Sequence, residues 1–178
     1  WKNYLISHLI MKNSSLLSEK LDGMNFEFRK ALTGQKEQLP RWKRGIQRVG
    51  SRYGLGSLLG KLYVERHFPP SSKEKMTDLV NNLRQAFRNR IEAIDWMTEE
   101  TKKEAYRKLS SFDPKIGYPE NWEDLNAIEI DQAELFLNAR RIQNFFQKRD
   151  IRKLDKKTDR TEWFMSAHNL NAYYMASF

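Results

Sequence analysis

The sequence predicts a mainly α-helical protein with one β-strand at its C-terminal end. Apolar residues recur every three or four positions over most of the chain, as they do on the buried face of a helix. Ser71 stands three residues before Glu74, the spacing of a capping box at a helix start. Asp131 and Glu134 repeat this spacing. Residues 163–178, by contrast, are rich in Trp, Phe and Tyr, which favour strands.

Three helical segments are expected in the first part of the chain. Residues 1–18 carry Leu and Ile pairs at helical spacing, and Gly34 is a plausible stop for a second segment. A third segment begins after Pro40 and continues as far as Pro69 and Pro70. Its expected apolar side consists of Ile46, Val49, Tyr53, Leu58, Leu62 and Tyr63.

Three further helices are expected before the strand. The one that begins at Ser71 has the most regular spacing of apolar residues, namely Met76, Val80, Leu83, Phe87, Ile91 and Ile94. Thr98 starts the next helix, since Glu99 and Glu100 suit its positive N-terminal dipole. The sequence IGYP at 116–119 is typical of a turn. A last helix follows Asp131 and carries Leu135, Ala139, Ile142 and Phe146.

The composition is that of a folded protein. Hydrophobic residues make up 39% and aromatic residues 12% of the 178 residues, which excludes intrinsic disorder. The mean hydropathy of −0.80 and the short apolar runs predict no transmembrane segment. Cys is absent from the sequence, so neither disulfides nor thiolate metal sites are expected. The three His residues are far apart in sequence, and none has the i, i+4 spacing of a helical zinc pair.

Four glycines, Gly50, Gly54, Gly56 and Gly60, lie in one short stretch. A phosphate-binding loop is disfavoured because position 59 is Leu where a dinucleotide fingerprint needs Gly. The favoured interpretation is close contact between helices at these small residues.

The net charge of +9 is concentrated between Arg140 and Arg160. A stand-alone basic helical domain that binds nucleic acid or an acidic protein is therefore an alternative function. No aromatic residue lies between Gln147 and Thr161, which disfavours stacking on single-stranded bases. A solvated helix end and loop is the favoured interpretation, and no nucleic-acid partner is expected.

Several phrases, in this order and at these intervals, resemble the neprilysin-like zinc metallopeptidases, a family that includes neprilysin, endothelin-converting enzyme and bacterial PepO. They are FRKALTG (28–34), RWKR (41–44), GKLYVERHF (60–68), DWMTEETKKEA (95–105), KIGYP (115–119), DRTEW (159–163) and NAYY (171–174). The resemblance implies a zinc-dependent metalloendopeptidase of oligopeptides as the parent protein. The absence of Cys is similar to bacterial members of the family.

The resemblance also implies a division of the chain. Residues 1–162 would form a helical lid over the substrate chamber, and residues 163–178 would enter the catalytic domain as an edge strand. The zinc ligands, including a His-Glu-x-x-His motif, would lie outside this chain, so the fragment alone is expected to be inactive. Export to the periplasm or cell surface is implied by the family alone. A degenerate, inactive member that serves as a scaffold remains an alternative.

Three residues are carried over from the family as substrate-binding residues. The amide of Asn171 offers both a donor and an acceptor for the backbone of an extended peptide. Ala172 would add a main-chain hydrogen bond, and its small side chain lets the peptide approach. Tyr173 would line the cleft. The alternative is that Asn171 only satisfies local backbone groups.

Overall fold

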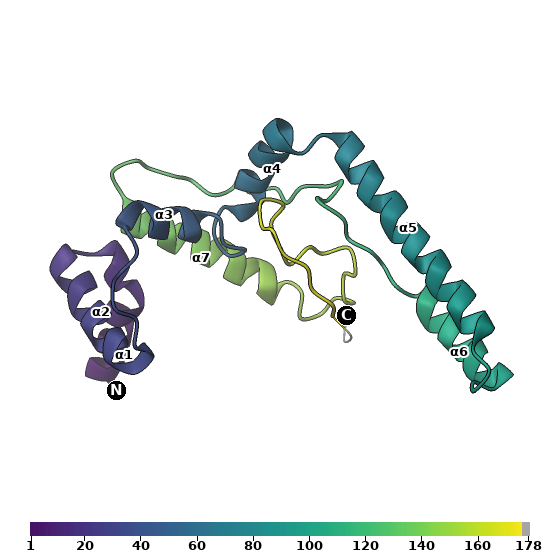
Figure 1. Ribbon diagram of the computed structural model, residues 1–178. Helices are drawn as coiled ribbons and strands as arrows, with labels where there is room; N and C mark the ends of the chain where they lie inside the picture. Colours follow the sequence, from purple (N-terminus) through teal and green to yellow (C-terminus); the bar gives the residue numbers. More distant parts are fainter. Residues whose placement is uncertain (176–178) are drawn as a thin grey trace. The chain divides into compact units, whose positions relative to one another are not determined.

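Residues 1–175 are described by a computed structural model, and within them lie seven α-helices and one short 3₁₀ helix (Figure 1). The helices are α1 (Lys2–Asn13), η1 (Ser14–Leu16), α2 (Glu19–Thr33), α3 (Arg41–Val49), α4 (Gly56–His67), α5 (Pro70–Ala93), α6 (Glu99–Ser110) and α7 (Leu135–Ile151). The chain forms two compact units, the first from residues 1–56 and 124–160 and the second from 57–123 and 161–175. The prediction of a mainly helical fold is confirmed.

The first unit begins with α1 and α2, joined by η1. Ser18 caps α2, since its hydroxyl accepts a hydrogen bond from the Leu21 amide at 3.5 Å. The helix ends at Gly34, whose φ of +72° lies in the left-handed region that glycine adopts without strain. The expected stop at Gly34 is confirmed.

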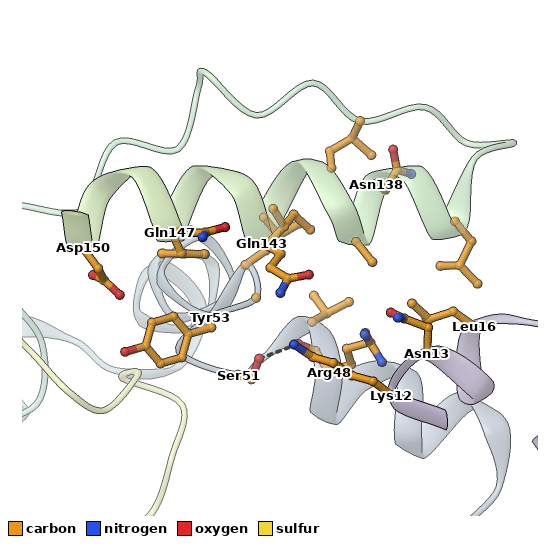
Figure 2. Close-up of a pocket in the computed structure, with 18 of the residues that line it drawn as sticks. Lys12, Asn13, Leu16, Arg48, Ser51, Tyr53, Asn138, Gln143, Gln147 and Asp150 are labelled. Carbon is orange, nitrogen blue, oxygen red and sulfur yellow. Dashed lines mark hydrogen bonds between the residues drawn. The ribbon is translucent and has the colours of Figure 1, made fainter. Parts of the chain in front are cut away.

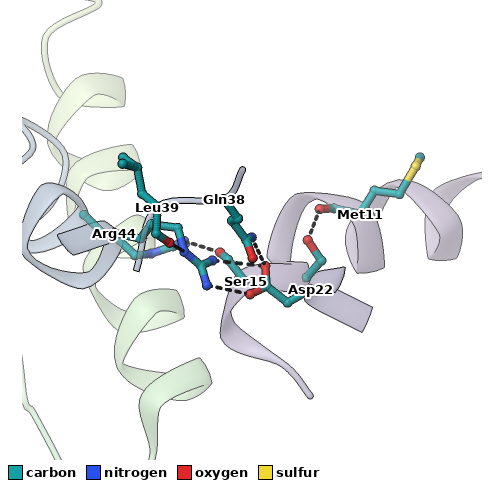
Figure 3. Close-up of polar contacts among 8 residues, drawn as sticks. Met11, Ser15, Asp22, Gln38, Leu39 and Arg44 are labelled. Carbon is teal, nitrogen blue, oxygen red and sulfur yellow. Dashed lines mark hydrogen bonds and ion pairs between the residues drawn. The ribbon is translucent and has the colours of Figure 1, made fainter. Parts of the chain in front are cut away.

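A polar cluster fixes the segment between α2 and α3 (Figure 3). Arg44 binds the carboxylate of Asp22 through both terminal nitrogens, at 3.1 and 2.8 Å. Gln38 donates to the same carboxylate at 3.2 Å, and the Arg44 Nε donates to the Leu39 carbonyl at 2.9 Å. Asp22 is buried, so the bidentate pair and the amide replace its hydration.

The expected third helix is two helices, α3 and α4, separated by a turn at residues 50–55. Inside the turn, the Ser51 hydroxyl donates to the Arg48 carbonyl at 2.8 Å. The Leu55 amide donates to the Val49 carbonyl at 2.7 Å. A Cβ at Gly54 would collide with the Arg48 carbonyl oxygen, so this close approach requires glycine. The spacing of apolar residues alone did not predict this break.

In the second unit, α5 and α6 form an antiparallel pair (Figure 1). Arg84 donates to the Leu109 carbonyl at 3.4 Å, and Lys102 donates to the Glu92 carbonyl at 3.1 Å. Between these contacts, the guanidinium of Arg88 lies 5.1 Å from the ring centre of Tyr106.

The predicted start of α6 is confirmed, and the predicted start of α5 is not. Thr98 caps α6 as predicted, its hydroxyl accepting from the Thr101 amide at 3.3 Å. The capping box at Ser71 and Glu74 is wrong, because α5 begins at Pro70 with Pro69 as its N-cap and no side-chain cap. Proline has a helical φ and needs no amide partner in the first turn, so the helix starts before Ser71.

The loop after α6 is held against the start of α5. Lys73 donates to the Tyr118 carbonyl at 2.8 Å, and its ammonium lies 4.4 Å from the Tyr118 ring centre. Tyr118 packs edge-on against Phe68 and is stacked with Trp122. Gly117 has a φ of +73°, and a Cβ there would collide with the Phe68 ring. The predicted turn at 116–119 is confirmed, with the Tyr118 amide bonded to the Ile116 carbonyl at 2.9 Å.

The start of α7 differs from the predicted capping box. Glu134 occupies the N-cap position without a side-chain cap and instead pairs with Arg141 at 2.6 Å. Asp131 accepts from the Ala133 amide at 2.7 Å. Its own backbone amide and carbonyl are both bonded by the Asn138 side chain. The side-chain amide of Asn138, one turn into the helix, thus fixes the entry of the chain together with the Asp131 carboxylate, and no capping box forms.

Residues 163–175 contain no β-strand, which corrects the expected strand over the part of 163–178 that the structure describes. A strand needs a neighbour to bond its amides and carbonyls, and nowhere within residues 1–175 is another strand present. Sequence propensity alone therefore does not produce strand here. None of the helices within residues 1–175 is long and apolar enough to cross a membrane.

Candidate functional site

The predicted substrate-binding residues lie in the segment 161–175, which packs in the second unit through aromatic contacts. Tyr173 meets Phe164 edge-on, with ring centres 6.5 Å apart, and its hydroxyl accepts from the Phe164 amide at 3.4 Å. The ring of Tyr174 lies 5.7 Å from that of Phe112, just after α6. The first contact closes the loop that contains residues 171 and 172, and the second holds the chain just after that loop.

Asn171 and Ala172 lie between Phe164 and Tyr173 in the chain and are exposed. The Asn171 side-chain oxygen accepts a hydrogen bond from the Ala172 amide at 2.8 Å. The local backbone contact considered as an alternative for Asn171 is therefore present in the chain by itself. The same geometry leaves the Asn171 NH₂ group and a second lone pair of its oxygen for another partner.

Residues 166–169 form a turn, closed by the Asn169 amide bonding the Ser166 carbonyl at 3.0 Å. Within this turn, Ala167 packs on Gly60 of α4, where a Cβ would lie 3.2 Å from the Ala167 nitrogen. The expected contact between helices is not what Gly60 makes. Its partner is this turn together with Trp122, and neither belongs to a helix.

His168 occupies the same turn and has a buried Nδ1 without a hydrogen-bond partner among the described residues. Burial lowers the pKa of His168 below its ordinary value, because a partly desolvated site disfavours the charged imidazolium. The turn therefore favours a neutral ring three residues before Asn171. Sequence spacing gave no signal for this environment.

The first unit holds a separate apolar groove of about 930 Å³ between α7 and the turn after α3 (Figure 2). Its polar rim includes Lys12, Arg48, Asn138, Gln143 and Gln147. Its apolar walls are Leu16, Val49, Leu55, Ile130, Leu135, Ala139, Ile142, Phe146, Ile151 and Leu154. The helical periodicity of α7 predicted an apolar face, and this face forms one wall of the groove.

At one end of the groove, two aromatic rings contact each other and a guanidinium group. Tyr53 meets Phe146 edge-on at 5.6 Å. The guanidinium of Arg149 lies 4.6 Å from the Phe146 ring centre and pairs with Asp150 at 2.9 Å. One of the basic residues that suggested nucleic-acid binding is therefore engaged within the fold. Others in this segment, including Lys148, Arg152 and Lys156, are exposed.

A metal site would need a cluster of ligands. Residues 1–175 contain no group of three or more His, Cys, Asp or Glu side chains placed to hold an ion. The donors within residues 1–175 therefore do not fit a catalytic zinc ion, which needs about three protein ligands.

Comparison with known proteins places this arrangement among peptidases. Residues 1–119 match the model of peptidase family M13. The chain is similar to mouse neprilysin, with 32% identity over 97% of this chain, and to human endothelin-converting enzyme 1, with 31% identity over 97%. The solved structure of the Mycobacterium tuberculosis zinc metalloprotease Zmp1 in complex with an inhibitor superposes with a TM-score of 0.81, at 39% identity over 94% of this chain.

The chain belongs to peptidase family M13. The resemblance to neprilysin-like zinc metallopeptidases is thereby confirmed, and the helices match a helical portion of such an enzyme. The chain spans 24% of mouse neprilysin, 23% of the human endothelin-converting enzyme and 25% of the mycobacterial protease chain. It therefore corresponds to about a quarter of the length of these relatives.

Proposed function

We propose that this chain is the central portion of a zinc-dependent endopeptidase that cleaves oligopeptides. The observation that carries the proposal is the match to peptidase family M13 over residues 1–119. Zinc would be bound by residues in other parts of the parent enzyme, since the donors within residues 1–175 do not fit it. Bound there, zinc would supply activated water for attack on the peptide bond.

Within this reaction, Asn171 and Ala172 would hold the backbone of an extended substrate, with Tyr173 beside the cleft. The exposed amide of Asn171 supports this role, because its NH₂ group can donate to a substrate carbonyl. The Ala172 amide now donates to Asn171, so it would exchange this bond for one to the substrate. Holding the backbone in one orientation aligns the scissile bond and lowers the entropy cost of reaction.

Two partners complete the proposed site, a peptide substrate and the remainder of the catalytic domain. In the parent, residues 1–162 would form the helical lid, and residues 163–178 would become an edge strand on pairing with that domain. The greater length of the relatives supports such pairing. Export to the periplasm or cell surface is proposed on the family resemblance, and fractionation of cells that express the parent protein would test it.

The substrate-holding role is tested by Asn171→Ala in the complete enzyme. A neutral hydrogen bond contributes on the order of 0.5–1.5 kcal/mol, and an unpaired buried partner costs roughly 1–3 kcal/mol. The substitution would remove two hydrogen bonds, and each 1.36 kcal/mol corresponds to about a tenfold change in rate. We therefore expect kcat/KM for a fluorogenic peptide to fall roughly ten- to a thousandfold. Zinc content and thermal stability should not change.

Asn169→Ala is the matched control, because Asn169 is an exposed amide in the same segment without a proposed substrate contact. Asn171→Asp keeps an acceptor but loses the donor, so it should also reduce kcat/KM. Unchanged kcat/KM in Asn171→Ala, or a loss that only follows lost zinc or lost stability, would remove Asn171 from the substrate site.

A further inference from the structure

Gly60 lies where α4 meets the turn that precedes Asn171, and the space around it has little room for a side chain. A Cβ on Gly60 would lie 3.2 Å from the Ala167 nitrogen, 3.5 Å from the Ala167 Cβ and 3.4 Å from a ring carbon of Trp122. Glycine inside a helix is unfavourable relative to alanine, so a helical glycine in such tight contact has a packing reason. By contrast, a Cβ on Gly45, inside α3, would meet no atom within 4 Å.

One of the two neighbours of Gly60 is held in place. Trp122 stacks on Tyr118 with a 6.3 Å separation of ring centres. Tyr118 in turn is fixed by Lys73, which bonds its carbonyl at 2.8 Å and lies over its ring. A side chain at position 60 would therefore displace Ala167 more readily than Trp122.

A shift of Ala167 would be transmitted toward Asn171 through a short series of hydrogen bonds and ring contacts. The 3.0 Å bond from the Asn169 amide to the Ser166 carbonyl closes the turn around Ala167. Beyond the turn, Phe164 and Tyr173 are joined by ring contact and by a hydrogen bond. Asn171 lies between these two restraints, four residues after Ala167.

We infer that Gly60 is a positioning residue for the substrate-holding segment. Because glycine has no side chain, the backbone of Ala167 can lie against α4. This contact sets the location of Asn171 and Ala172. The inference rests on the proposed peptidase function, because it assigns Gly60 a role through Asn171. Gly60 itself does not contact the substrate.

The test is Gly60→Ala in the complete enzyme, with Gly45→Ala as the matched control. A 1 Å misplacement can cost about a hundredfold in rate, so a shift of a few tenths of an ångström should lower kcat/KM roughly three- to thirtyfold. Gly60→Val should lower it further. The melting temperature of Gly60→Ala should stay within about 2 °C of the parent, since alanine is the better helix former. Gly45→Ala should leave kcat/KM unchanged.

Two further measurements separate positioning from a general loss of stability. In an Asn171→Ala background, Gly60→Ala should change kcat/KM by less than about twofold, because residues that act through one another are not additive. Amide hydrogen exchange of residues 167–172 should become faster in Gly60→Ala and remain unchanged in Gly45→Ala. The exchange measurement does not depend on peptidase activity.

The outcomes distinguish the two proposals. If Asn171→Ala has no effect on kcat/KM, the assignment of the substrate site fails, and faster exchange in Gly60→Ala would still support the contact. If Asn171→Ala is impaired while Gly60→Ala is not, the inference about Gly60 is overturned. An equal loss in both backgrounds, a loss that follows a lower melting temperature, or unchanged exchange would overturn it as well.

Discussion

Among single residues, Arg44 makes the most extensive polar contacts with a buried group. It binds both oxygens of the Asp22 carboxylate, which is 7% exposed. The sequence contained both residues but no spacing that would pair them, because they lie 22 positions apart. Their contact depends on the path of residues 34–40, which brings α3 back to α2 (Figure 3).

Arg44→Leu should destabilise the protein by about 3 kcal/mol, because it leaves a buried carboxylate without its cation. Urea unfolding of the complete protein measures this free energy. Lys30→Leu is the control, since Lys30 pairs with the exposed Glu27 at 3.5 Å and such a pair contributes less than about 1 kcal/mol. Equal effects of the two substitutions would contradict the importance assigned to Arg44.

For the proposed site, the sequence identified the residue types and the structure added their immediate surroundings. Asn171, Ala172 and Tyr173 were singled out by resemblance, and their roles toward substrate remain predictions. The bonds from Ala172 to Asn171 and from Phe164 to Tyr173 were not predictable, since each depends on the local bend of the chain. The buried Nδ1 of His168 likewise depends on packing.

At the scale of helices, local chemistry predicted some ends well. Thr98 and Gly34 act within one turn of their own helix, through a side-chain cap and a left-handed φ, so neighbouring sequence was sufficient. The break between α3 and α4 was missed because apolar spacing continues across residues 50–55 while the glycines permit a tight turn.

Gly23, inside α2, and Gly34, the C-cap that follows it, should respond to alanine in opposite ways. Gly34→Ala should destabilise the protein by roughly 1–2 kcal/mol, because alanine is strained at a φ of +72°. Gly23→Ala should stabilise it by roughly 0.5–1 kcal/mol, because Gly23 lies inside α2 with open space around its Cα. Thermal and urea unfolding of both variants would measure the difference. Changes of the same sign would contradict the assigned end of α2.

For the whole molecule, the main feature is how little apolar surface the chain buries by itself. Among the described hydrophobic residues, only Leu125 and Phe146 are almost fully covered, at 3% exposure each. Large apolar side chains such as Phe28 and Phe87 remain 60% exposed. Exposed apolar surface on this scale is typical of places where other protein packs. It agrees with a chain that spans about a quarter of its relatives.

The isolated chain should therefore be helical but loosely packed, without peptidase activity. We expect a helical far-UV spectrum, strong binding of a hydrophobic dye and a broad thermal transition. After dialysis it should retain less than one equivalent of zinc, because the described residues lack a ligand cluster. The complete enzyme is the control for each measurement. Stoichiometric zinc, or peptide cleavage that a chelator abolishes, in the pure chain would overturn this expectation.

The sequence by itself determined the helical class, the caps at Thr98 and Gly34, and the family, because these depend on residue types at short spacings or on recurring phrases. The tertiary structure decided the Arg44–Asp22 pair, the groove beside α7 and the close contact between Ala167 and Gly60. It also decided that residues 163–175 form no strand, despite their propensity. The physical reason is the same in each case. Buried ion pairs, tight backbone contacts and strand pairing all need a partner that is distant in sequence, and local preference cannot specify that partner.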